Sequence, residues 1–239
     1  MRVLGLDTAL GALSVAVIAE ARVLASAFEM MTRGQAELLA PMTARVLAEA
    51  GLLPAAIDRI AVTTGPGTFT GQRVGLGFAR GLAQSCGAQC VGVTTLAAMA
   101  AEACARHPGT AIHVAASDAR RGEAYVQIFA VHGAELSALS GPALMSHDAL
   151  VARVQAFGAD QPIILSGTAF AAIGGEFGRA DLIISGVLQP NAIHVALLGG
   201  RADPATNPPE PLYLRDADAK LPGPPKPLPP RGPKRAARA

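Results

Sequence analysis

Residues 2–19, RVLGLDTALGALSVAVIA, decide the fold class of this 239-residue chain. Two apolar runs suited to β-strands frame the pair Asp7-Thr8, and a third run follows after a link short enough for a hairpin. Helical periodicity and β-branched runs then alternate. We expect strands at residues 2–6, 13–19, 22–28, 57–62 and 89–93, and helices at residues 35–50, 72–85 and 95–106. Hairpin-linked strands followed by helical crossovers predict a mixed sheet with helices packed on it.

The second half of the chain repeats this order, and Asp118 follows its first strand as Asp7 follows the first strand of the first half. We expect strands at residues 111–116, 123–131, 135–139, 162–165 and 182–184, and helices at residues 148–157, 168–177 and 191–201. Two copies of a β-β-β-α-β-α order predict an α/β protein with two lobes. This layout resembles the ribonuclease-H-like lobes of the actin-like ATPase superfamily. The expected lobes are residues 1–106 and a smaller 107–219, with helix 191–201 returning to the first.

A proline-rich, basic segment occupies residues 220–239. It holds six lysines and arginines and no acidic residue, whereas residues 1–219 hold 14 cations against 18 acidic residues. A segment with seven prolines and no aromatic residue cannot form a core, so we expect a disordered, extended tail. The simplest interpretation is a solvated tail, and the alternative is a weak, salt-dependent contact with RNA phosphates.

The composition argues against several classes of chemistry. Because residues 1–219 contain no lysine, they fit neither a Walker-type phosphate loop nor a Schiff-base or pyridoxal site. The absence of tryptophan and the two tyrosines argue against a stacking surface for single-stranded nucleic acid. Three cysteines without a CxxC pair and five scattered histidines argue against disulfides and a protein-built metal site. With Asp7 inside the first apolar run and no membrane-spanning run, we expect a cytoplasmic protein that binds no membrane.

Two turns carry the candidate nucleotide or phosphate site. At Asp7-Thr8, a carboxylate could attract magnesium while backbone N–H groups receive phosphate oxygens, or Asp7 could merely cap the turn. The loop TGPGTFTG at residues 64–71 opens directly into a helix, whose N-terminus favours anions. The candidate residues of this cleft are Asp7, Thr8, Gly65, Gly67, Thr68, Thr70, Gly71, Arg73 and Asp118. Four glycines in or beside the following helix, Gly71, Gly75, Gly77 and Gly81, suggest close packing on the chain's own sheet or on another chain.

Four segments make the sequence similar to the TsaB (YeaZ) family: VLGLDTALGALSVAV, GPGTFTGQRVGLGFARGLA with VGVTTLAAMA after it, SDARRGEAYV and PLYLRDA. The resemblance implies a role in forming N6-threonylcarbamoyladenosine, beside the anticodon of tRNAs that read codons beginning with A. The partners that it implies are the TsaD transferase and the TsaE ATPase, with tRNA reached through the complex. It also implies a homodimer when the chain is alone.

The same resemblance implies a non-catalytic subunit. The TsaD relative carries an HxxxH pair on the helix after the glycine loop, and those imidazoles bind a metal that positions the threonylcarbamoyl-adenylate. Thr95 and Met99 occupy the two positions here. Because a hydroxyl and a thioether make a poor site for such a cation, we expect no catalytic residue and no metal or cofactor of its own. ATP or ADP with magnesium would sit at the interface of the complex.

Two apolar helix stripes are the candidates for the partner interface. They consist of Leu38, Leu39, Met42 and Val46 on the first helix and Val74, Phe78 and Leu82 on the second. Each residue could equally belong to the core, but two helices from each partner would build a four-helix interface.

Two other functions stay open. Asp7, the glycine loop and Asp118 also fit a stand-alone actin-like ATPase or kinase, and a remoter resemblance is to glycopeptidase-like metallopeptidases.

Overall fold

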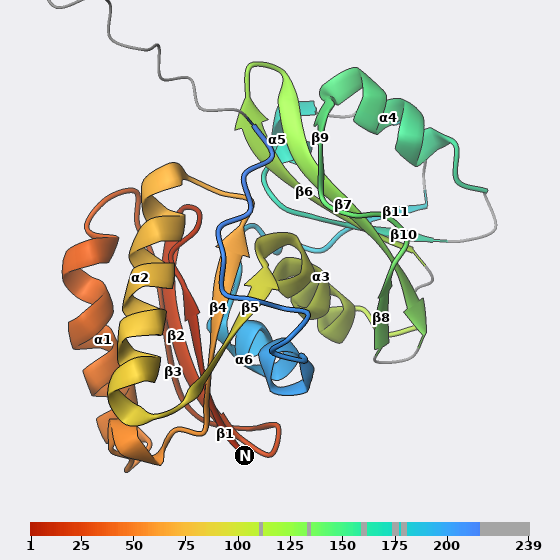
Figure 1. Cartoon of the computed structure of the whole chain (residues 1–239). Coiled ribbons are helices and arrows are strands. Elements are labelled where there is room, and N and C mark those ends of the chain that lie inside the picture. The colour runs from red at the N-terminus through yellow and green to blue at the C-terminus, as the bar shows by residue number, and fades with distance from the viewer. Residues whose placement is uncertain (110–111, 133–134, 159–161, 174–176, 178–180, 216–239) are drawn as a thin grey trace, which may run out of the picture.

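The computed structural model describes residues 1–109, 112–132, 135–158, 162–173, 177 and 181–215, and the predicted tail at residues 220–239 lies outside them. The first lobe is built on a five-stranded sheet of order β3-β2-β1-β4-β5 (Figure 1). Its strands are β1 (Arg2–Asp7), β2 (Ala12–Ala19), β3 (Arg22–Met30), β4 (Arg59–Gly65) and β5 (Gln89–Thr94). The three hairpin strands are antiparallel, while β4 and β5 continue the sheet in parallel.

The second sheet has the order β11-β10-β6-β7-β8, and β9 pairs with β7 beside this path. Its strands are β6 (Ile112–Arg120), β7 (Glu123–His132), β8 (Glu135–Ala138), β9 (Ala143–Ser146), β10 (Ile163–Ser166) and β11 (Leu182–Ile184). Both sheets thus follow the same path, which confirms the predicted α/β fold with two mixed sheets. The sequence analysis did not predict β9.

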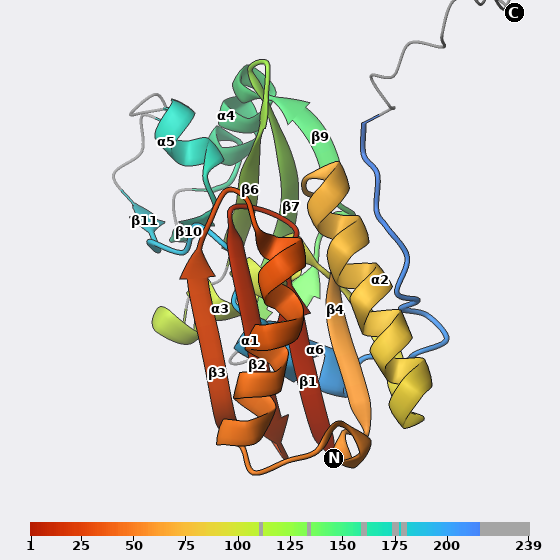
Figure 2. The same ribbon diagram turned by 90° about the vertical axis from the view of Figure 1, so that its left-hand side faces the viewer.

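Helices cover both faces of each sheet. Helices α1 (Gln35–Glu49) and α2 (Phe69–Cys86) lie on one face of the first sheet, and α6 (Ala192–Arg201) lies on the other (Figure 2). In the second lobe, α4 (His147–Gln155) and α5 (Ala169–Ile173) cover one face and α3 (Thr95–Arg106) covers the other. The short 3-10 helix η1 (Pro54–Ala56) leads into β4. None of the helices in the described ranges is both long and apolar enough to cross a bilayer.

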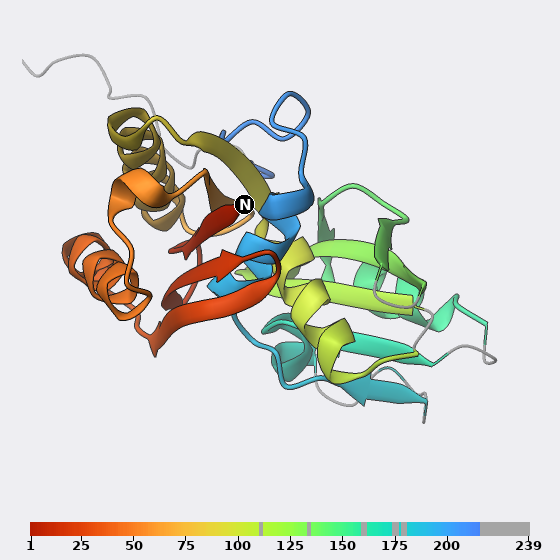
Figure 3. The same cartoon turned by 90° about the horizontal axis from the view of Figure 1, so that it is seen from below.

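The two lobes exchange a helix. Helix α3 follows β5 of the first lobe but packs on β6, β7 and β10 of the second, whereas α6 follows β11 and packs on β1, β2 and β4. The two helices also contact each other and lie between the two sheets, as Figure 3 shows. Because each inner face is covered by a helix that the chain supplies from the other lobe, the exchange holds the lobes together.

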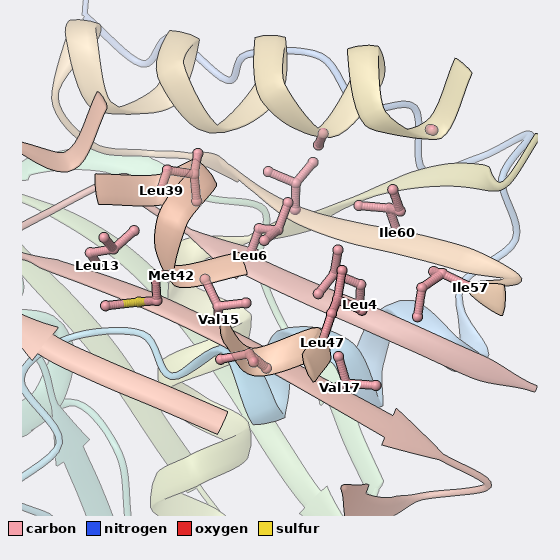
Figure 4. Packing of buried hydrophobic residues seen from close by; sticks show 14 of the residues in the cluster. Leu4, Leu6, Leu13, Val15, Val17, Leu39, Met42, Leu47, Ile57 and Ile60 are labelled. Carbon is pink, nitrogen blue, oxygen red and sulfur yellow. The ribbon is translucent and has the colours of Figure 1, made fainter. Parts of the chain in front are cut away.

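A large apolar core lies between the first sheet and the helices α1 and α2 (Figure 4). Leu39, Met42 and Val46 are part of it, and none is more than 5% exposed. A buried side chain of this size stabilises the fold by about 1.5–3 kcal/mol. Their prediction as partner-interface residues was therefore wrong. The periodic apolar residues of α1 face the sheet and pack against it. Leu38, by contrast, is 42% exposed.

Candidate functional site

The glycine loop joins β4 to α2 as the sequence predicts, but the helix starts at Phe69 instead of Gln72. Thr68 is the reason, because its Oγ1 accepts a hydrogen bond of 3.1 Å from the Gly71 amide and so caps the helix. Gly65 is the last residue of β4. The candidate loop is thus a short turn between a buried strand and a capped helix.

The loop lies directly against the β1–β2 turn. The Thr8 hydroxyl donates to the Gly71 carbonyl at 2.7 Å, and the Thr68 amide donates to the Ala9 carbonyl at 2.8 Å. A Cβ atom on Gly67 would lie 2.4 Å from the Ala9 oxygen, and one on Gly71 would lie 2.1 Å from the Thr8 oxygen. These glycines therefore allow two segments of the same chain to touch.

Asp7 is completely buried at the end of β1. Its Oδ1 accepts from the Thr63 hydroxyl at 2.7 Å and from the Ala9 amide at 3.2 Å, while Oδ2 has no hydrogen-bond partner among the described residues. Burial raises the pKa of this carboxyl to about 7, although the two hydrogen bonds oppose the shift. Asp7 is therefore largely protonated below neutral pH when no cation is beside it.

Four backbone amides of the two turns have acceptors within the protein. The Ala9 amide donates to Asp7, the Thr68 amide to Ala9, the Gly71 amide to Thr68, and the Gly11 amide to Oε1 of Gln189 at 2.8 Å. A bound phosphate would need several of these donors. These four donors are therefore engaged within the protein and are not free for a phosphate. No group of three or more His, Cys, Asp or Glu side chains suited to a metal occurs within the described part of the chain.

Of the remaining candidate residues, Thr70 lies at the same loop, whereas Asp118 and Arg73 contact other segments. Asp118 is exposed on the second lobe, where its amide donates to Thr168 Oγ1 at 3.0 Å and its Oδ1 accepts from the Arg120 amide at 2.8 Å. It therefore caps its own turn. Thr70 lines a shallow pocket of about 420 Å³ between the starts of α1 and α2. Arg73 points to the C-terminal segment and donates to the hydroxyl of Tyr213 at 3.0 Å.

The two positions that correspond to the HxxxH pair are enclosed. Thr95 and Met99 on α3 are 0% exposed, and Met99 packs with residues of the second sheet, among them Ala115 and Phe129. The Ser117 hydroxyl lies 4.0 Å from the Met99 sulfur. Both side chains are therefore closed off from solvent.

The exposed face of α2 differs from the face that packs on the sheet. Val74, Phe78 and Leu82 are half-buried against the core. Gly77 and Gly81 face outward, and a Cβ atom on either would meet nothing within 4 Å. These two glycines are thus not explained by packing within this chain.

Sequence reasoning missed Gln189 and Thr63, which complete the turns. Gln189 contacts Gly11 across 178 positions of the chain, and Thr63 contacts Asp7 across 56. No local pattern marks such contacts. The segment PLYLRDA was one of the four segments that carry the family resemblance, and the structure places its Tyr213 in contact with the candidate residue Arg73.

Comparison with known proteins identifies the family. The protein-family model described as "TsaD: tRNA N6-adenosine threonylcarbamoyltransferase" matches residues 29–221 of this chain. A curated protein of Escherichia coli (strain K12), named tRNA threonylcarbamoyladenosine biosynthesis protein TsaB, is 34% identical over 237 residues, which cover 93% of this chain and 99% of that protein. The chain belongs to the TsaB family.

Solved structures agree with this membership. The structure titled "YeaZ from Pseudomonas aeruginosa" has a TM-score of 0.77 and 29% identity, and the match covers 89% of this chain and 99% of that one. The ethanolamine utilization protein EutJ from Carboxydothermus hydrogenoformans matches with a TM-score of 0.51 and 13% identity over 83% of this chain and 90% of its own, which is a likeness of fold alone. The predicted TsaB (YeaZ) family and actin-like ATPase fold are confirmed.

Proposed function

We propose that this chain is a non-catalytic subunit of the machinery that forms N6-threonylcarbamoyladenosine in tRNA. The observation that carries the proposal is the match to Escherichia coli TsaB over nearly the full length of both proteins. The enclosed positions of Thr95 and Met99 support the non-catalytic role, because a metal-dependent transferase needs an open coordination position. As a tRNA-modifying component, the protein would work in the cytoplasm.

The partner of this subunit is a transferase of the TsaD type, bound through the outer face of α1 and α2. Leu38 is exposed on α1, and the outward-facing Gly77 and Gly81 let a partner helix approach the α2 backbone. Two helices from each protein would then form a four-helix contact, and two copies of this chain would use the same face when no partner is present. TsaE would join this pair, and tRNA would be modified by the complex.

Any ATP or ADP with magnesium belongs to the assembled complex rather than to the turns of this chain. The saturated amides at Ala9, Gly11, Thr68 and Gly71 support this assignment, as does the buried carboxyl of Asp7. The same contacts count against a stand-alone ATPase or kinase. No observation favours a metallopeptidase.

The proposal is tested by expressing the chain with the TsaD-type transferase of the same organism. Co-purification as a stable complex and threonylcarbamoylation of tRNA that depends on both proteins would support it. Thr95→Ala is the informative variant, because the proposal predicts unchanged modification once folding is verified by circular dichroism. Modification by this chain alone, or an equal rate without it, would overturn the proposal.

A further inference from the structure

A cavity of about 600 Å³ lies where the two exchanged helices, α3 and α6, meet β8. Small-molecule sites in proteins have volumes of roughly 300–1,000 Å³, so this cavity is large enough for such a ligand. Figure 3 shows α3 and α6 lying together between the two sheets. The cavity is therefore built at the junction of the two lobes, and it shares no described residue with the turns or with the outer face of α1 and α2.

Most of the described residues that line the cavity are small or apolar. On each helix the lining positions follow a spacing of three, four and seven residues, so one face of each helix borders the cavity. The apolar side chains are Ala101, Cys104 and Ala105 of α3, Leu197 and Leu198 of α6, and Leu136 of β8. None of these six is fully buried. An apolar surface is thus left for another molecule to cover.

Arg201, in the last turn of α6, is the one cationic side chain among the described residues that line the cavity. It is exposed, and its guanidinium forms no ion pair or hydrogen bond with the residues that the structure describes. Another arginine caps the end of this helix, since Arg59 Nη1 donates to the Gly199, Gly200 and Ala202 carbonyls at 3.0, 3.3 and 2.8 Å. The Arg201 guanidinium is therefore available to an anion in the cavity.

The other ionisable groups that line the cavity limit the charge of its ligand. Burial lowers the pKa of His194 although the charge of Glu102 opposes the shift, so the imidazole is neutral at pH 7. Burial raises the pKa of the Cys104 thiol to about 11, so this side chain is uncharged as well. Glu135 of β8 is exposed, and its carboxylate would repel a second negative charge. The cavity thus suits a single anionic group placed beside Arg201.

We propose that this cavity binds a small amphipathic anion, with its apolar body between α3, α6 and β8 and its one carboxylate or similar group on Arg201. Removal of the apolar body from water supplies affinity, while the guanidinium selects the charge and fixes the orientation of the ligand. The proposal goes beyond a role in tRNA modification and does not depend on it. Because the ligand would bind the folded chain at the junction of the lobes, it should also raise the Tm.

The test is a fluorescence titration of the full chain with 8-anilinonaphthalene-1-sulfonate, which has an apolar aromatic body and one sulfonate. We expect saturable binding that decanoate displaces at least about tenfold more effectively than decylammonium, both below their micelle-forming concentrations. This preference should disappear in Arg201→Gln, because the ionic hydrogen bond is lost. Ala105→Leu, at an exposed position of α3, should weaken dye binding at least about tenfold by filling part of the cavity.

Arg22→Gln and Ala152→Leu are matched controls, because each changes an exposed residue that does not line this cavity. Both should keep the dye affinity and the charge preference of the wild type. Absence of saturable binding would overturn the proposal, as would equal displacement by decanoate and decylammonium. A charge preference that survives in Arg201→Gln, or an equal dye affinity of Ala105→Leu and Ala152→Leu, would overturn it too, because the dye would then bind elsewhere.

Discussion

The Thr8 hydroxyl donates a hydrogen bond of 2.7 Å to the Gly71 carbonyl oxygen, and this bond joins the β1–β2 turn to the first turn of α2. Both turns consist of residues that resemble a phosphate site in sequence. In this chain the two turns bind each other, since the Thr8 hydroxyl and the Thr68 amide both find acceptors in the opposite turn. These contacts stabilise the first lobe.

Replacing Asp7 with Asn should stabilise the protein at alkaline pH. The unfolded carboxyl loses its proton near pH 4, whereas the folded one keeps it until about pH 7, so the stability that Asp7 supplies at low pH declines between these values. Asp7→Asn removes this decline while keeping the oxygen that accepts from Thr63 and Ala9. We expect a gain of about 4 kcal/mol at pH 8, seen as a Tm about 8–16 °C higher, and little change at about pH 4 and below. A lower Tm at pH 8 would contradict the assignment.

Gly71→Ala and Gly77→Ala should have opposite effects, although both lie in α2. At Gly71 the new Cβ meets the Thr8 carbonyl, so the variant should lose about 1–3 kcal/mol of stability. At Gly77 the new Cβ meets no other atom of the chain within 4 Å. Because alanine has less backbone entropy than glycine in the unfolded chain, the free energy of unfolding should rise by about 0.5–1 kcal/mol. Urea unfolding of the two variants measures both changes. Equal effects would show that the loop and the turn are not in close contact.

His113 should make the protein sensitive to acid. It is fully buried, and neither ring nitrogen has a hydrogen-bond partner within the described residues. Burial lowers its pKa to about 3, so below pH 6.5 the unfolded chain binds a proton that the folded chain does not, and stability falls. At pH 5 the loss is about 2 kcal/mol. His113→Leu should reduce the drop in Tm between pH 7.5 and pH 5, and an unchanged drop would count against this explanation.

Gly81→Leu should block partner binding without harming the fold. The leucine side chain projects from the exposed face of α2, where a Cβ meets no other atom of this chain within 4 Å. We expect a Tm no lower than that of the wild type and at least about a hundredfold loss of affinity for the TsaD-type partner, because a bulky residue keeps the helices apart. Gly141→Leu, at a second-lobe glycine with equally open surroundings, is the matched control. If calorimetry shows that Gly81→Leu binds the TsaD-type partner as well as the wild type does, the interface does not include this face of α2.

The sequence predicted the order of strands and helices well, because the hairpin runs around Asp7 and Asp118 and the helical periods are local signals. It could not separate core from surface on α1. A stripe such as Leu39, Met42 and Val46 has the same period whether it faces a sheet or a partner.

Contacts between distant residues were also beyond local reasoning. The glycine spacing predicted close approach but not which glycines face the protein, so Gly71 and Gly77 looked alike. The contact between Gly11 and Gln189 and the stacking of Phe69 on Tyr213 arise only when the exchanged helix α6 returns the chain to the first lobe.

The most direct test of the central claim is the rate of tRNA threonylcarbamoylation by the TsaD-type partner with this chain carrying Asp7→Asn. If the chain acts as a non-catalytic subunit whose turns are structural, the variant should bind the partner normally and support the wild-type rate. A variant that still binds the partner but lowers the rate about tenfold or more would place Asp7 in the reaction and contradict the account.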